Sequence, residues 1–150
     1  IDAGADVFLA GLPDLENPLH IASLNGTQNQ LRIAALLVEK GKEGLINSKT
    51  RLGYTPIIVA TIKGHAGLVK LLVDCGGDVN IRLPPGETAG LSALHLACIK
   101  GYGKIARLLC AAGAMIDVTD EDGMTPMKYA EQKGHIACME ALQDFSEGRF

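Results

Sequence analysis

Four times along the chain, a residue that can cap a helix is followed by the same pattern of apolar residues. The copies begin 38, 37 and 33 residues apart, at Asn17, Thr55, Ser92 and Thr125. The side-chain oxygen of Asn, Thr or Ser accepts a hydrogen bond from the free amides of the first helical turn. Proline follows in three copies, at the position where a helix needs no N–H donor. Each copy therefore predicts the start of a helix.

Each predicted first helix is short, because a glycine follows about nine residues after its cap, at Gly26, Gly64, Gly101 and Gly134. A second helix follows in every copy, with apolar residues at positions i, i+3 and i+4 that form one stripe. These stripes are Ile33, Leu36 and Leu37; Leu68, Leu71 and Leu72; Ile105, Leu108 and Leu109; and Cys138, Ala141 and Leu142. A second row of glycines closes the units, at Gly4, Gly41, Gly76 and Gly113. One such unit cannot cover its own apolar face, so the pattern predicts an all-α solenoid of stacked helix-turn-helix units.

These residues resemble the ankyrin repeat, whose motif runs D-x-x-G-x-T-P-L-H-x-A, G-H, I-V-x-L-L-L and G-A-D-V-N. The matching residues include Thr55-Pro56, Gly64-His65, Leu71-Leu72, Asp78-Val79-Asn80, Ser92-Ala93-Leu94-His95 and Gly123-Met124-Thr125-Pro126. The resemblance covers essentially the whole chain and implies an ankyrin-repeat solenoid with reversing β-turn loops. It implies a single domain divided into the tail of a preceding repeat (1–12), three repeats (13–49, 50–82 and 83–119) and a C-terminal cap (120–150).

Three segments are longer than the family's period of roughly 33 residues allows. Extra residues lie around Thr27–Gln30, around Lys42–Gly44 and in the link 83–89, which contains Pro84-Pro85-Gly86. Insertions in solenoids map to loops on one face, often the binding face, although tolerated variation in loop length explains any single insertion equally well.

Composition and charge exclude several functions. A net charge of −3 and a pI of about 5.8 argue against a nucleic-acid binder. The longest apolar runs fall short of the roughly 20 residues of a membrane span. The cysteines, which include no C-x-x-C pair, are typical of small buried side chains in a reducing compartment, here the cytoplasm, the nucleus or both.

Motifs for cofactors and catalysis are weak. Gly101, Gly103 and Ala106 fit a dinucleotide fingerprint but follow a predicted helix, where that fingerprint requires a strand. The pairs His95/Cys98 and His135/Cys138 lie in different repeats, whereas zinc needs four converging ligands. We therefore expect no cofactor, no metal and no catalytic site.

The resemblance also implies roles for two polar positions. His20 and His95 occupy the histidine of the motif, which joins neighbouring loops by hydrogen bonds in the family. Asn80 occupies the loop-stabilising asparagine, a residue that an oxygen-sensing dioxygenase hydroxylates in some members. Asn80 is thus a candidate for hydroxylation.

Function is then expected on surface positions that the fold leaves free, namely the loop tips and the last turn of each first helix. The candidate partner-binding residues are Leu24, Asn25, Arg51, Leu52, Tyr54, Ile62, Lys63, Leu91, Ile99, Lys100, Met124, Gln132 and Lys133. We expect a non-catalytic scaffold or adaptor that binds a protein segment with apolar anchors and acidic flanks in a concave groove. A targeting or regulatory domain of a larger enzyme or channel fits the pattern too, and packing of Leu24, Ile62 and Ile99 against neighbouring helices is an alternative to binding.

Overall fold

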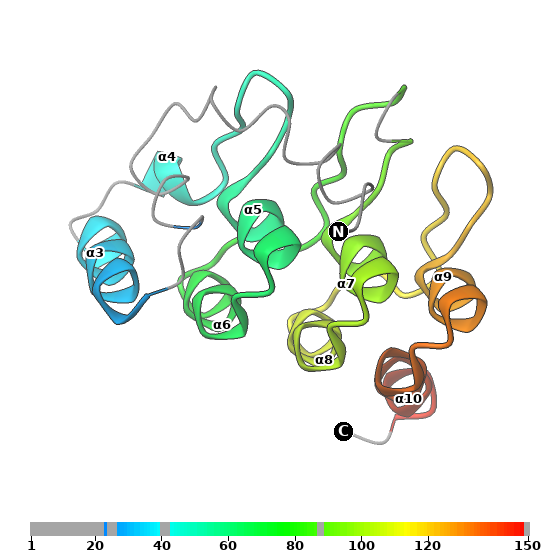
Figure 1. Ribbon diagram of the computed structural model, residues 1–150. Coiled ribbons are helices and arrows are strands. Elements are labelled where there is room, and N and C mark those ends of the chain that lie inside the picture. Colours follow the sequence, from blue (N-terminus) through cyan, green and yellow to red (C-terminus); the bar gives the residue numbers. More distant parts are fainter. Residues whose placement is uncertain (1–22, 24–26, 40–42, 87–88, 149–150) are drawn as a thin grey trace.

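The computed structural model describes residues 23, 27–39, 43–86 and 89–148, where helices follow one another in antiparallel pairs (Figure 1). The first helices of successive pairs lie side by side, and the second helices form a parallel row beneath them. The pairs are α5 (Pro56–Lys63) with α6 (Ala66–Asp74), α7 (Ala93–Lys100) with α8 (Gly103–Ala111), and α9 (Pro126–Lys133) with α10 (Ile136–Ser146); α3 (Gln28–Glu39) and α4 (Glu43–Ile46) precede them. The predicted helical solenoid is therefore confirmed, and the only strand pairing among the described residues is an antiparallel bridge between Arg82 and Ser92.

The first helix of each described pair begins and ends where the sequence predicts. The hydroxyls of Thr55, Ser92 and Thr125 accept the N–H of the third helical residue over 3.2 to 3.3 Å. Each helix stops at a left-handed glycine, with φ of 75° at Gly64, 78° at Gly101 and 71° at Gly134. The predicted helix that starts at Asn17 lies outside the described residues.

Two of these glycines also receive a ring from the next repeat. A methyl group on Gly64 would lie 2.9 Å from the Tyr102 ring, and one on Gly101 would lie 2.9 Å from the His135 ring. Glycine is needed at both positions for two reasons: the backbone φ is positive, and a side chain would clash with the ring. The turn inside one helix pair is therefore shaped to fit the turn inside the next pair.

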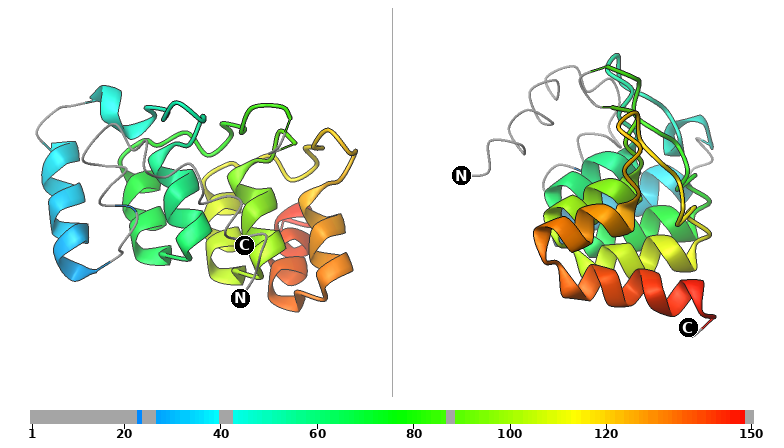
Figure 2. Two further views of the ribbon diagram at one scale, coloured as in Figure 1. Left: turned by 45° about the horizontal axis from the view of Figure 1, so that its top comes forward. Right: turned by 90° about the vertical axis from the view of Figure 1, so that its right-hand side faces the viewer.

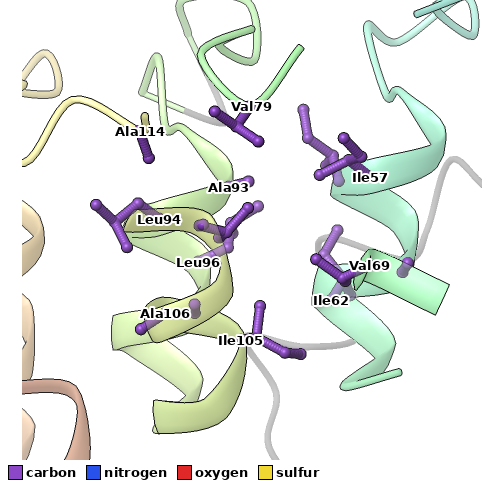
Figure 3. Packing of buried hydrophobic residues seen from close by; sticks show 14 of the residues in the cluster. Ile57, Ile62, Val69, Val79, Ala93, Leu94, Leu96, Ile105, Ala106 and Ala114 are labelled. Atoms are coloured by element: carbon purple, nitrogen blue, oxygen red, sulfur yellow. The ribbon is translucent and has the colours of Figure 1, made fainter. Parts of the chain in front are cut away.

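The core runs continuously between the pairs. Leu72 and Leu109 are fully buried, as predicted, and Figure 3 shows Ile57, Ile62 and Val69 facing the α7–α8 pair. Apolar side chains thus meet between repeats as well as within them, which is the packing expected of a solenoid. The stripe of α10 is buried in the same way, at Cys138, Ala141 and Leu142.

Helix α3 departs from the prediction. Ile33 is 45% exposed and Leu36 is 54% exposed, whereas Ala34 is fully buried. Among the described helices, α3 packs on α4 and α6, while α8 lies between α6 and α10. The expected stripe is thus wrong for Ile33 and Leu36, whereas Leu37 packs against the core. Among the described elements, α6 is the outer helix that lies beside α3.

We expect Leu72→Ala or Leu109→Ala to lower the free energy of unfolding by about 2–5 kcal/mol, because each leaves a cavity in the core. Urea unfolding followed by circular dichroism measures this change. The control is Leu36→Ala, which removes an exposed side chain and should cost about 0.5 kcal/mol or less. Equal costs for all three variants would contradict the assigned core.

Candidate partner-binding face

Three long loops project from the same side of the helix stack (Figure 2), and we call them finger 1 (47–55), finger 2 (80–86 and 89–92) and finger 3 (115–125). Asparagines tie the bases of fingers 1 and 2 to the next repeat. Asn47 Oδ1 accepts the Asp78 N–H over 2.7 Å, and Asn80 Oδ1 accepts the Met115 N–H over 2.9 Å. The Asn80 amide also donates to the Gly113 carbonyl over 3.2 Å. The loop-stabilising role implied for Asn80 is confirmed, and its hydroxylation stays a prediction.

His95 forms a second bridge, between fingers 2 and 3. Its Nδ1 accepts the Ser92 N–H over 3.1 Å, so the proton is on Nε2, which donates to the Met124 carbonyl over 2.9 Å. The imidazole is fully buried, and burial lowers its pKa, although the bond to Met124 acts in the opposite direction. The joining role implied by the resemblance is confirmed for His95, whereas His20 lies outside the described residues. The Ser92 hydroxyl also contacts Nδ1, but both residues are buried and the hydroxyl caps α7, so this pair is structural.

Asp120 organises finger 3. Its Oδ1 accepts the N–H groups of Asp122 and Met124, each over 2.9 Å, and its Oδ2 accepts the Tyr129 hydroxyl. Burial acts to raise the pKa of this carboxyl, but the hydrogen bonds outweigh burial and hold the pKa below its usual value. Burial and the Asp120 carboxylate together raise the pKa of Tyr129. A charged carboxylate therefore fixes the turn that carries Glu121 and Asp122.

The inserted segment 83–89 is attached to finger 3 at its described ends. Arg82 Nε donates to the Gly90 carbonyl over 2.8 Å, and Nη2 of the same guanidinium donates to the Thr119 carbonyl. The Gly86 N–H reaches Glu121 Oε2 over 3.2 Å, and the Glu121 N–H reaches the Ala89 carbonyl over 2.9 Å. The described part of the insertion is thus an ordered extension of finger 2.

Three of the predicted binding residues are not on the surface. Tyr54 and Ile62 are each 3% exposed and Leu91 is 4% exposed, so the expectation that they present apolar side chains to a partner is wrong. All three belong to the apolar core, and Figure 3 places Ile62 beside Val69 and opposite Ile105. The alternative interpretation of Ile62, packing between helices, is confirmed.

The remaining described candidates do reach solvent. Arg51, Leu52, Lys63, Gln132 and Lys133 are exposed, and Ile99, Lys100 and Met124 are half-buried. The three lysines are the last residues of α5, α7 and α9, where positive charge also favours the helix carboxyl terminus. Leu24 and Asn25 lie outside the described residues.

The thiols follow the prediction with one exception. Cys98, Cys110 and Cys138 are buried, and burial raises the pKa of Cys110 to about 11. Cys75 is exposed, so the prediction of a buried thiol is wrong there, because this residue follows the last turn of α6 instead of lying on its apolar stripe.

Both histidines of the His–Cys pairs contact backbone carbonyl oxygens. His135 Nδ1 lies 2.7 Å from the Cys98 carbonyl oxygen, and His95 binds the Met124 carbonyl as described above. The described residues contain no group of three or more metal-ligating side chains. In the same part of the chain, no helix is long and apolar enough to cross a membrane.

The comparisons with known proteins agree with this geometry. A family model for ankyrin repeats in three copies matches residues 3–83 and again residues 81–148. The chain belongs to the ankyrin-repeat family. Ankyrin repeats are protein-interaction modules.

Several relatives of this chain are longer proteins, of which the chain matches only a part. The chain is 35% identical over 66% of its length to the human ankyrin repeat and KH domain-containing protein 1, of which it covers 4%. It is 32% identical over 86% of its length to the target of rapamycin complex 2 subunit AVO2 of Saccharomyces cerevisiae, of which it covers 29%. It is 40% identical over 49% of its length to human protein phosphatase 1 regulatory subunit 27, of which it covers 46%. The chain therefore spans less than half of each of these relatives.

Sequence reasoning missed the residues that hold the fingers together. Arg82 and Tyr129 carry no motif signal, because their partners are a backbone carbonyl and a carboxylate in a different finger or helix. Asp120 occupies the aspartate of the D-x-x-G-x-T-P motif, but its bond to Tyr129 depends on how α9 packs. The sequence signal for this turn is the aspartate itself, because an aspartate side chain commonly accepts the backbone N–H two residues further on, here that of Asp122.

We expect Asn80→Ala to lower the free energy of unfolding by about 1–2 kcal/mol, because it removes two hydrogen bonds between neighbouring repeats. Asp117→Ala is the matched control, since Asp117 is exposed at the same position of the next repeat and should change stability by about 0.5 kcal/mol or less. Chemical unfolding of both variants measures the difference. An Asn80→Ala chain as stable as the wild type would contradict the bridge.

We expect stability to fall as the pH drops below 6.5, the ordinary pKa of histidine, because the folded chain holds His95 neutral while the unfolded chain protonates it. The slope contributed by one such group reaches about 1.4 kcal/mol per pH unit. Asp120 acts in the same direction only in more acidic solution, below its ordinary value of 3.8. Urea unfolding of wild type and His95→Gln between pH 7 and 5 measures the effect, and equal slopes for the two proteins would contradict it.

Proposed function

We propose that this chain is a non-catalytic protein-binding module of the scaffold or adaptor kind. In this proposal, a partner segment lies across the carboxyl ends of α5, α7 and α9, which are the ends of these helices away from the fingers. The observation that carries it is the lysine at the last position of each of these neighbouring helices: Lys63, Lys100 and Lys133. The three positions repeat from one helix pair to the next, so they form a row along the stack.

The spacing of this row suggests which partner fits. Packed helices lie roughly 8–10 Å apart, so consecutive lysines are separated by about that distance. A partner in the extended polyproline II conformation rises roughly 3.1 Å per residue with three residues per turn, so side chains three residues apart lie on the same side. Carboxylates at every third residue of an extended partner therefore match the row, and we propose a segment with acidic residues at this interval.

The apolar part of the site is smaller than the sequence suggests. With Tyr54, Ile62 and Leu91 in the core, the side chain that we propose as the anchor is the half-buried Ile99, which is next to Lys100 in the last turn of α7. The half-buried Met124 lies in finger 3, at the opposite end of α9 from Lys133. A partner's apolar side chain placed on Ile99 lies between the lysines that end α5 and α9, which supplies the acidic flanks with their counter-charges. Buried anchors of this kind dominate affinity, while charges at the rim mainly set association rate and salt dependence.

A second candidate function is supported by the comparisons. The chain covers only 4% to 46% of the relatives described above, two of which are named as a subunit of a larger complex and as a regulatory subunit. The same face could thus serve as the regulatory or targeting part of a larger enzyme or channel. The free thiols, three of them buried, support a reducing compartment in the cytoplasm or nucleus for either role.

The experiment presents the chain with a library of extended peptides that carry aspartate or glutamate at varied intervals around one apolar residue. We expect enrichment of peptides with acidic residues three positions apart. Fluorescence anisotropy then measures their affinity for Lys63→Glu with Lys133→Glu and for Ile99→Asp. We expect the lysine pair to weaken binding and flatten its salt dependence, and Ile99→Asp to abolish binding.

The matched control is Lys70→Glu with Lys104→Glu, which makes the same charge change on the outer helices α6 and α8. Both of these side chains are exposed, and far-ultraviolet circular dichroism checks that all variants fold. Peptides that bind the inner-helix variants normally but lose affinity for this control would place the site on the outer face instead.

A further inference from the structure

The hydroxyl groups of the described serines and threonines differ in whether they form a hydrogen bond and whether they reach solvent. Threonines and serines at helix starts cap them, Thr50 accepts the Tyr54 N–H, and Ser48 and Ser146 donate to backbone carbonyls. Thr61 is fully buried in α5. Thr119 alone among the described serines and threonines is exposed with a hydroxyl that makes no hydrogen bond. It is therefore the described hydroxyl most accessible to chemical modification.

The residues after Thr119 are all acidic: Asp120, Glu121 and Asp122. Glu121 and Asp122 are exposed, at the second and third positions after the threonine. Asp120 is buried, and its bonds to the backbone of finger 3 keep this turn in one conformation. Protein kinases discriminate among substrates partly by charge patterns, so a kinase with a basic substrate groove would favour carboxylates beside the hydroxyl.

Arg82 provides a counter-charge at the same place. Its guanidinium donates to the carbonyl oxygen of Thr119 itself, and the side chain is exposed. The Thr119 hydroxyl is only a few covalent bonds from that carbonyl. A phosphate there carries a charge of about −1.5 to −2 and pairs well with the planar, double-donor guanidinium.

We propose that Thr119 is a phosphorylation site for an acid-directed protein kinase, and that Arg82 receives the phosphate. In the reaction, Thr119 Oγ1 attacks the γ-phosphorus of ATP, an Oγ1–P bond forms, and the bond from that phosphorus to ADP breaks. The hydroxyl proton goes to the kinase's base, and ADP leaves. The product adds a dianionic group where finger 2 meets finger 3.

The test treats the whole folded chain with a kinase that selects acidic residues on the carboxyl side, together with Mg²⁺ and ATP. Intact mass and peptide sequencing locate the phosphate. We expect one phosphate, on Thr119, and none on Thr119→Val. A chain that stays unmodified while a control peptide substrate is consumed, or one modified only elsewhere, overturns the proposal.

Two double variants test whether the acidic residues direct the kinase. Glu121→Gln with Asp122→Asn should lower the initial rate several-fold, and the glutamine keeps an oxygen for the Gly86 N–H. Glu131→Gln with Glu140→Gln removes the same charge from exposed sites on α9 and α10 and should leave the rate unchanged. Equal rates for both double variants overturn the recognition by acidic residues.

Phosphorus NMR tests the role of Arg82. The second pKa of a phosphothreonine is about 6, and a neighbouring guanidinium lowers it because it stabilises the dianion. We expect a lower phosphate pKa in the phosphorylated wild type than in phosphorylated Arg82→Gln, with Arg82→Lys between them. The same phosphate pKa in all three proteins overturns the pairing with Arg82, whatever the variants do to stability.

Discussion

A helix pair in this chain carries more apolar surface than its two helices can cover, and stacking on a neighbour is the only way to bury the rest. Leu72 and Leu109 are fully buried because α6, α8 and α10 lie side by side. Helix α3 shows what happens when this stacking is incomplete among the described elements. It has one outer helix beside it among the described elements, and Ile33 and Leu36 of α3 remain exposed.

The polar groups of the fingers are arranged around this stack. Apolar side chains such as Tyr54 and Leu91 bury the base of a finger. The rest of its position depends on hydrogen bonds to the next repeat, made by Asn47, Asn80, Arg82 and His95. Most of these bonds reach backbone atoms. Because backbone atoms accept or donate these bonds, the finger positions depend on the stacking distance of the helices and tolerate changes in the side chains of the neighbouring repeat.

The local features could be predicted from the sequence because each depends on a few neighbouring residues. Thr55 and Gly64 bound α5 through a hydroxyl cap and a left-handed backbone, and both signals are visible in the sequence alone. The burial of Ile62, Tyr54 and Leu91 could not be predicted in this way. Whether a side chain on an inner helix or at a finger base reaches solvent depends on the repeat packed against it, and sequence position does not specify that. The same reason explains why the bond from Arg82 to finger 3 was missed, since it joins residues 37 positions apart.

The fit of the Tyr102 ring on Gly64, and of the His135 ring on Gly101, has a consequence for how such a chain can change over generations. Each contact joins the glycine that ends a first helix to the residue that follows the equivalent glycine of the next repeat. A whole repeat that is gained or lost therefore brings or removes one such glycine together with one such following residue, and the contacts between the remaining repeats can form again. A single residue gained inside a helix has no such compensation, because it turns every later side chain away from its partner. Length variation should therefore accumulate in the fingers, where the extra residues of 83–89 lie, and whole repeats should be the units that are gained or lost.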